Sequence, residues 1–160
     1  MITLPHGNGG AEMTAAENGP FRDFFYDVRP IWLKEPLAET LGAFKQESVE
    51  LDYSYIDAVK AAGHACPTVT GAFLCCQESL DALYEGQTPV RGEIAITLYG
   101  RPEEGALGVM AQVFTFLTGA APNTGFKGLG PRFKRRGLLT FDPEKTDEEA
   151  TCCRFERLDT

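Results

Sequence analysis

The chain has 160 residues, of which 43% are hydrophobic and 24% are charged. These proportions are close to those of globular domains, and a chain of this length forms one domain with a sizeable core. No apolar run approaches the roughly 18 residues that a membrane-spanning helix needs. The first residues also lack the basic and then apolar pattern of a secretory signal. We therefore expect a cytoplasmic protein with no membrane partner.

The net charge of −8 argues against a nucleic-acid partner, because an acidic protein is repelled by phosphate backbones. The positive charge is nevertheless segregated, since no acidic residue occurs between Glu104 and Asp142. Cations gather near the end of this stretch, at Lys127, Arg132, Lys134, Arg135 and Arg136. A cluster of this size suits a small anionic ligand or a single partner rather than a duplex.

Four of the five cysteines form two adjacent pairs, Cys75-Cys76 and Cys152-Cys153. Adjacent cysteines rarely bridge each other because the geometry is strained. Without a secretory signal, reduced thiols are the default. The cysteines are therefore expected to be core residues, metal ligands or reactive thiols.

The first 35 residues are expected to form a leader and an aromatic arm. Glycines break up residues 1–20, which favours a loose N-terminus. Residues 21–35 are rich in aromatic side chains but are interrupted by Pro30 and followed by Pro36. This irregular arm is expected to pack on the domain or on another subunit, and residues 36–160 are expected to form a single domain.

Apolar spacing and capping residues predict two helices in the next part of the chain. The first begins at Pro36 and continues through residue 44, with Leu37 and Leu41 on one face. The second has Asp52 as its N-cap and Gly63 as its C′ residue.

Two further helices and three strands are predicted after residue 63. One helix begins at Pro67, a residue favoured at the first helical position, and stops at Gly86. The other covers residues 106–117. Helices early in the chain and strands late in it indicate an α+β fold with helices packed on a sheet. The predicted strands are residues 93–98, 138–141 and 152–158.

The segment Gly63-His64-Ala65-Cys66-Pro67 carries the clearest chemistry. If Pro67 is the first helical residue, Cys66 is the N-cap, beside unpaired backbone N–H groups and the positive end of the helix dipole. Both effects stabilise a thiolate, the form of cysteine that binds metals or attacks electrophiles. His64 is two residues away, and a thiolate with an imidazole suits a transition metal such as zinc.

This segment and two later blocks resemble the FmdE-like family, which is named for a component of formylmethanofuran dehydrogenase. Its GHxCP signature is similar to residues 63–67, with Gly71 four residues on. Its second block, a helix with an internal glutamine that ends in Leu-Thr-Gly, is similar to residues 108–119. Its Thr-x-Gly-Lys-Gly turn is similar to residues 124–128, with one residue inserted.

The resemblance implies an α+β fold like the catalytic domain of glyceraldehyde-3-phosphate dehydrogenase, with a mixed or antiparallel sheet. It also implies bound zinc or another transition metal near the GHxCP turn, a link to one-carbon metabolism, and assembly as a homodimer or within a larger complex. Three positions depart from the family pattern. Ala62 replaces its first histidine, Thr68 replaces its glycine, and the cysteine that often opens its second block falls near Leu107 or Gly108. These departures leave the metal site depleted or rebuilt.

His64 and Cys66 are two candidate ligands, whereas structural zinc takes four ligands and catalytic zinc takes three and a water. Cys75 is nine residues beyond Cys66, about 13 Å along a helix, which is too far for one ion. One member of the Cys152-Cys153 pair is a possible further ligand. Other candidate ligands are three residues on the segment before the turn, Tyr53, Tyr55 and Asp57. His6 is the only other histidine, but a loose leader seldom supplies a ligand within its own subunit.

A second candidate site is the glycine-rich loop around Lys127 and Gly128. Glycines, exposed N–H groups and a cation are the ingredients of an anion-binding nest. The loop lacks the GxxxxGK[ST] order of a nucleotide-binding loop. In the family this turn places its lysine near the metal cleft, so Lys127 is expected to receive an anionic group there. Gln112 is expected on the wet side of its helix from periodicity and in the cleft from the resemblance.

Three functions follow from these residues. The first is a metal-binding accessory or ligand-binding protein, with His64 and Cys66 on the metal and Lys127 on an anionic ligand. The second is an enzyme of one-carbon or acyl chemistry that uses Cys66 as a nucleophile or a metal-bound water. The third is a structural or assembly component with a degenerate metal site.

Overall fold

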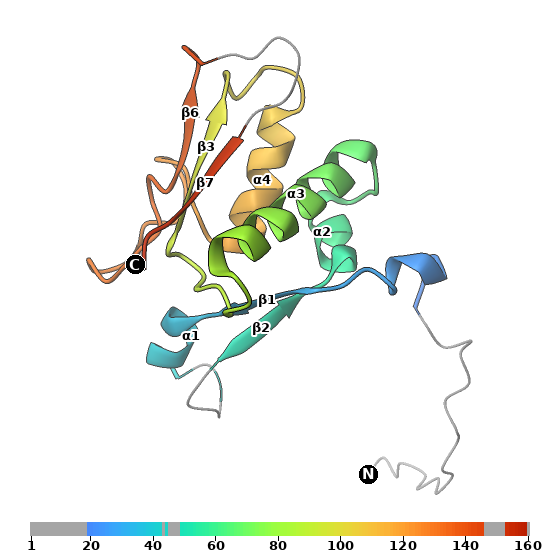
Figure 1. Ribbon diagram of the computed structural model, residues 1–160, viewed down its shortest axis with the longest axis horizontal. Helices are drawn as coiled ribbons and strands as arrows, with labels where there is room; N and C mark the ends of the chain where they lie inside the picture. Colours follow the sequence, from blue (N-terminus) through green and yellow to red (C-terminus); the bar gives the residue numbers. More distant parts are fainter. Residues whose placement is uncertain (1–18, 43, 45–48, 146–152, 160) are drawn as a thin grey trace, which may run out of the picture.

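A computed structural model describes residues 19–42, 44, 49–145 and 153–159, which form an α+β arrangement of helices and small sheets (Figure 1). The short elements are η1 (Asp23–Phe25), α1 (Pro36–Thr40), β4 (Gly128–Leu129) and β5 (Phe133–Lys134). The main helices are α2 (Tyr55–Ala62), α3 (Pro67–Tyr84) and α4 (Leu107–Thr118). The longer strands are β1 (Ile31–Lys34), β2 (Glu50–Tyr53), β3 (Ile94–Tyr99), β6 (Leu139–Asp142) and β7 (Cys153–Arg157).

The central sheet has the strand order β6-β3-β7. Strand β3 pairs in parallel with β6 and antiparallel with β7, so the sheet is mixed. Because β6 is parallel to β3, the chain crosses between them through α4. Helices α3 and α4 pack against each other and lie beside the sheet, and α2 packs on both of them (Figure 1).

The core lies between α3, α4 and the sheet. Phe73 of α3, Phe114 of α4 and Leu98 of β3 have no exposed surface. The alternation expected for residues 93–98 is confirmed, because Ile94, Ile96 and Leu98 are buried while the residues between them are partly exposed. None of the described helices is long and apolar enough to span a membrane.

The N-terminal arm is more regular than the sequence predicted. Residues 31–34 form β1, which pairs antiparallel with β2 and buries Ile31 and Leu33 in the core. The short strand was missed because Pro30 and Pro36 enclose it and its alternation covers only four residues. Residues 1–18, the expected leader, lie outside the part that the structure describes.

Two predicted helix boundaries were wrong. Helix α1 ends at Thr40, and Leu41 and Phe44, predicted to continue its apolar face, are both exposed. Asp52 lies in β2, and the N-cap of α2 is Ser54. Serine caps this helix because its hydroxyl and the carboxylate of Asp57 each accept a hydrogen bond from the other residue's backbone N–H. The helices predicted from Pro67 and over residues 106–117 are confirmed.

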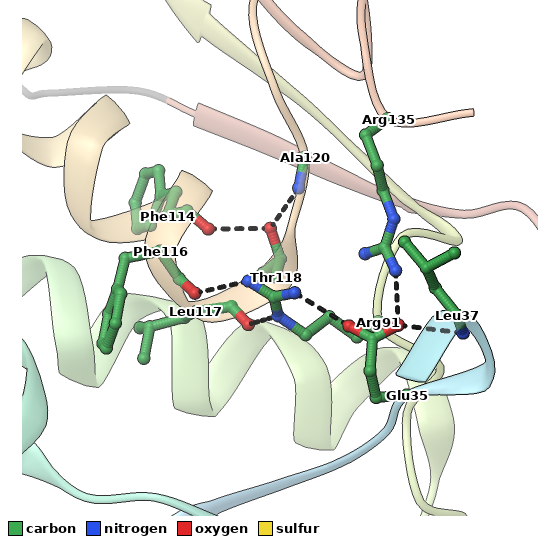
Figure 2. A network of polar contacts seen from close by, with 9 residues as sticks. All are labelled: Glu35, Leu37, Arg91, Phe114, Phe116, Leu117, Thr118, Ala120 and Arg135. Carbon is green, nitrogen blue, oxygen red and sulfur yellow. Dashed lines mark hydrogen bonds and ion pairs between the residues drawn. The ribbon is translucent and has the colours of Figure 1, made fainter. Parts of the chain in front are cut away.

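A buried carboxylate, Glu35, joins the segment before α1 to two arginines (Figure 2). Its Oε2 lies 2.8 Å from Nη1 of Arg91, and its Oε1 lies 2.6 Å from Nη2 of Arg135. Its Oε1 also accepts a hydrogen bond from the backbone N–H of Leu37, which caps α1.

Arg91 also closes the C-terminal end of α4 (Figure 2). Its guanidinium donates to the carbonyl oxygens of Phe116 and Leu117, at 2.9 and 3.0 Å. The last carbonyls of a helix lack partners within the helix and carry its negative dipole end, so a cation is favourable there. The Glu35 network therefore links the arm, α4 and the loop before β6.

The network corrects the prediction that Arg135 belongs to a cationic cluster suited to an anionic ligand or a single partner. Its side chain is only 3% exposed, and burial lowers the pKa of its guanidinium. Its Nη1 is a buried donor for which no partner is found among the described residues, and it lies against Gly119. Arg135 is therefore a structural residue, unlike its exposed neighbours Arg136 and Lys134.

Candidate functional site

The Gly63–Pro67 turn connects α2 to α3 and presents His64 and Cys66 at the surface. Gly63 ends α2 in the left-handed conformation, with a φ of 76°, which glycine adopts without strain. Pro67 is the first residue of α3, so Cys66 is its N-cap, as the sequence predicted. His64 is exposed and Cys66 is partly exposed.

The environment of Cys66 favours a thiolate. The backbone N–H of Val69 lowers the pKa of the Cys66 thiol most, and the N–H of Thr68 and the His64 side chain lower it further. Partial burial of the sulfur opposes this shift. The N–H groups belong to the first turn of α3, where backbone donors lack partners within the helix.

His64 is oriented by its own turn. Its Nδ1 lies 3.0 Å from the carbonyl oxygen of Ala62. This contact, followed by the nearby Cys66 side chain, raises the pKa of the imidazole. The two shifts support each other, because an imidazolium stabilises the thiolate and the thiolate stabilises the imidazolium. Both shifts are in the direction of the charged, proton-transferred form of the pair.

Cys66 borders an open, largely apolar groove. The N-terminal arm forms one wall with Phe24, Phe25 and Val28. The other wall comes from α2, α3 and the turn between them, through Tyr55, Ala65, Pro67, Thr70, Gly71 and Leu74.

Two polar contacts fix the groove beside the thiol. The hydroxyls of Tyr55 and Thr70 lie 2.7 Å apart, and the Thr70 hydroxyl donates to the carbonyl oxygen of Cys66 at 3.0 Å. The Tyr55 ring also stacks edge-to-face on Phe25 of the arm, with ring centroids 5.1 Å apart. The sequence placed Tyr55 near the site, but the aromatic wall from the arm was not predicted.

His64 and Cys66 do not form a complete metal site with the residues that the structure describes. No group of three or more histidine, cysteine or carboxylate side chains with metal-binding geometry occurs within those ranges. His6 and Cys152 lie outside them. Asp57 is held in the α2 capping box, and Tyr53 lies under the guanidinium of Arg91. Two donors are fewer than zinc takes from a protein.

The cysteines of α3 and β7 lie away from this turn. Cys76 is fully buried in the core, as predicted. Cys75 faces Cys153, with their sulfur atoms 3.6 Å apart. Cys153 is therefore placed beside α3 and not at the predicted metal position next to Cys66.

Gln112 lies near the turn that carries His64, whereas Lys127 lies in a different part of the molecule. Gln112 is exposed on α4 and borders a small hollow between α2 and α4, which also includes Ala62 beside His64. Lys127 is exposed, and its carbonyl oxygen accepts the backbone N–H of Arg135 at 3.0 Å. In Figure 1 the segment around Lys127 lies at the left and the turn between α2 and α3 at the right. The structure therefore does not bring Lys127 to the Cys66 groove.

Gly128 has a structural reason to be glycine. Its φ is 86°, and a Cβ atom there would lie 1.8 Å from the carbonyl oxygen of Phe133 across the β4–β5 pair. The close approach of two backbones thus accounts for this residue. Its predicted role in ligand binding stays a prediction.

A second cavity, of about 330 Å³, lies between the arm and the C-terminal half of α3. An ion pair between Arg29 and Asp81 borders it, together with the exposed ring of Trp32. The amide of Gln77 donates to the carbonyl oxygen of Arg29 at 2.6 Å. Sequence reasoning missed this cavity because the strand that forms one wall, β1, was not predicted.

Comparison with known proteins assigns no family: no family model matches the chain, and no curated protein or solved structure matches it significantly.

Proposed function

We propose that the protein acts through the Cys66 thiolate on a small ligand that enters the neighbouring groove. The observation that carries this proposal is the position of Cys66 at the N-terminus of α3, with its thiol pKa lowered by the helix amides and His64. The apolar walls of the groove suit a ligand with an apolar body and one electrophilic centre.

The chemistry that fits this arrangement is acyl transfer. The Cys66 sulfur attacks a carbonyl carbon, and a carbon–sulfur bond forms as the bond to the leaving group breaks. The leaving group departs with the bonding electrons and takes a proton from the His64 imidazolium. An acyl thioester on Cys66 and a neutral imidazole remain, and water or a second nucleophile then releases the acyl group.

A transition-metal site is the second candidate, and the orientation of His64 favours it. Donation from Nδ1 to the Ala62 carbonyl oxygen leaves Nε2 as the nitrogen with an available lone pair, as is usual for metal-bound histidines. The resemblance to the FmdE-like family supports zinc and a homodimer. It also supports the dehydrogenase-like α+β fold and a role in one-carbon metabolism. Because the described residues supply two donors, further ligands would have to come from elsewhere.

Metal analysis combined with alkylation separates the two candidates. Both are measured on the Cys75→Ser variant, because Cys75 has a lowered thiol pKa of its own and would compete for iodoacetamide. The acyl-transfer proposal predicts substoichiometric metal and fast alkylation of Cys66 that a chelator does not change. The metal proposal predicts near-stoichiometric metal and alkylation only after chelation.

The matched control is the Cys66→Ser, Cys75→Ser double variant. It should lose the fast phase of alkylation and keep the folded structure, since serine preserves the shape of a partly exposed N-cap. Slow alkylation of Cys66 in metal-free protein would overturn the thiolate proposal. Unchanged metal content in the double variant would overturn the metal proposal.

A further inference from the structure

The second pair of cysteines joins α3 to the edge of the central sheet. Cys75 of α3 and Cys153 of β7 are 78 positions apart in the chain, and their sulfur atoms lie 3.6 Å apart. A disulfide bond is about 2.05 Å long, so the two sulfurs have to approach by about 1.5 Å to form one.

The packing of β7 fixes Cys153 on the side that faces the helices. Side chains alternate along a strand, so Cys153 and Phe155 share one face. The Phe155 ring packs edge-to-face on Phe114 of α4, with centroids 5.1 Å apart, which identifies this face as the helix-covered one. Cys153 therefore points toward α3 because of the register of the strand.

A second contact holds the same two elements together farther along. The guanidinium of Arg157 lies over the Tyr84 ring, 4.2 Å from its centroid. From Cys75 to Tyr84 the helix rises about 13 Å, and from Cys153 to Arg157 the strand extends about 13 Å. The distance between the two contacts is therefore the same along α3 as along β7. The helix and the strand run side by side, with Cys75 opposite Cys153 and Tyr84 opposite Arg157.

The Cys75 thiol differs from the neighbouring Cys76 thiol in its pKa. The side chain of Cys153, followed by a contribution from Ser79, lowers the pKa of the Cys75 thiol to about 6. Burial raises the pKa of the Cys76 thiol far above its usual range. Both Cys75 and Cys153 are partly exposed, whereas Cys76 has no exposed surface.

We propose that Cys75 and Cys153 form a reversible disulfide when the protein meets hydrogen peroxide. The Cys75 thiolate attacks a peroxide oxygen, the O–O bond breaks, and a sulfenic acid and hydroxide form. The Cys153 sulfur then attacks the sulfenic sulfur. The S–O bond breaks, and the hydroxide that leaves takes the Cys153 proton as water. Two thiols are oxidised to one disulfide, the peroxide is reduced to water, and a dithiol reductant reverses the change.

The disulfide would couple the redox state of the protein to the stability of its C-terminal strand. Within the part of the chain that the structure describes, β7 is an edge strand of the sheet and pairs with β3 alone. A cross-link to the middle of α3 closes a long loop, which restricts the unfolded chain. The oxidised protein should therefore unfold at a higher temperature than the reduced protein.

Peptide mapping of the full-length protein tests this proposal. The Cys66→Ser variant is treated with hydrogen peroxide, its remaining thiols are blocked, and it is digested with trypsin. Trypsin leaves residues 61–91 in one peptide and residues 146–154 in another. The expected product is a disulfide between these two peptides, which dithiothreitol removes.

Three further substitutions in the same background assign the two sulfurs. Cys75→Ser and Cys153→Ser should each abolish the linked peptides, and Cys152→Ser should retain them. Linkage that survives Cys75→Ser, or that Cys152→Ser abolishes, would overturn the assignment. The absence of any linked peptide after peroxide treatment would overturn the proposal itself. A second measurement is the unfolding temperature of the oxidised and the reduced protein. Oxidation should raise the unfolding temperature when Cys75 is present and should not raise it in the Cys75→Ser variant. A rise that remains in this variant would contradict the proposal.

Discussion

Two glycines, Gly63 and Gly119, have the same backbone conformation but differ in the space around them. Gly63 and Gly119 both end a helix in the left-handed conformation, with φ values of 76° and 73°. A Cβ atom on Gly63 would meet no atom within 4 Å, whereas one on Gly119 would lie 2.1 Å from Nη1 of Arg135. The first glycine is required only by conformation, and the second also makes room for a buried arginine.

Alanine at these two positions should therefore have unequal effects on stability. Gly63→Ala is expected to cost about 1 kcal/mol, the usual penalty for alanine in this conformation. Gly119→Ala is expected to cost about 2–4 kcal/mol, because overpacking against Arg135 adds to that penalty. Urea denaturation of the two variants measures the difference. Equal losses in the free energy of unfolding would show that the Arg135 side chain does not clash with a Cβ atom at position 119.

At the scale of single elements, α2 depends on its N-terminal capping box. The Ser54 backbone N–H donates to Oδ2 of Asp57 at 3.0 Å, and the Asp57 N–H donates to the Ser54 hydroxyl at 3.2 Å. This helix delivers Gly63 and His64 to the site, so its N-terminus supports the turn indirectly.

Ser54→Ala should lower the free energy of unfolding by about 1 kcal/mol. Asp57→Ala should have a similar effect, because each change breaks the same reciprocal pair. The double variant should lose clearly less than the sum of the two single losses, which denaturant unfolding of all three measures. Additive losses would contradict the reciprocal cap.

Elements that begin at a characteristic residue, such as a proline at the first helical position, were predicted from the sequence. Pro67 at the first helical position identified the start of α3 and placed Cys66 at its N-cap, which is the main feature of the candidate site. Contacts between distant segments were not predictable. Cys153 was not paired with Cys75 because the two residues are 78 positions apart in the chain. β1 was missed because it is a strand of only four residues between Pro30 and Pro36.

At the scale of the whole molecule, the Glu35 network holds three segments together. One carboxylate faces two arginines, so the buried cluster of these three residues carries an excess positive charge. The sequence grouped Arg135 with the cations expected to bind an anionic ligand, because its charge can be read from the sequence but its burial cannot. Its partner is 100 positions away in the chain.

Glu35→Gln should destabilise the protein by about 3 kcal/mol or more, because it leaves two guanidiniums without a buried counter-charge. Glu78→Gln, an exposed position on α3, is the control and should change stability by about 0.5 kcal/mol or less. Thermal and urea unfolding of both variants provide the comparison. A Glu35→Gln variant as stable as its control would show that the network does not hold the fold together.

The central claim is that His64 and the start of α3 lower the pKa of the Cys66 thiol, and the pH dependence of its alkylation tests this most directly. The rate with iodoacetamide is measured across pH in the Cys75→Ser background, with His64 and with His64→Ala. A lowered thiol pKa keeps the thiolate populated as the pH falls, so the rate should decline only below the pH at which an ordinary cysteine loses reactivity. His64→Ala should move that decline to higher pH. A Cys66 that titrates like an ordinary thiol, unchanged by His64→Ala, would contradict the account.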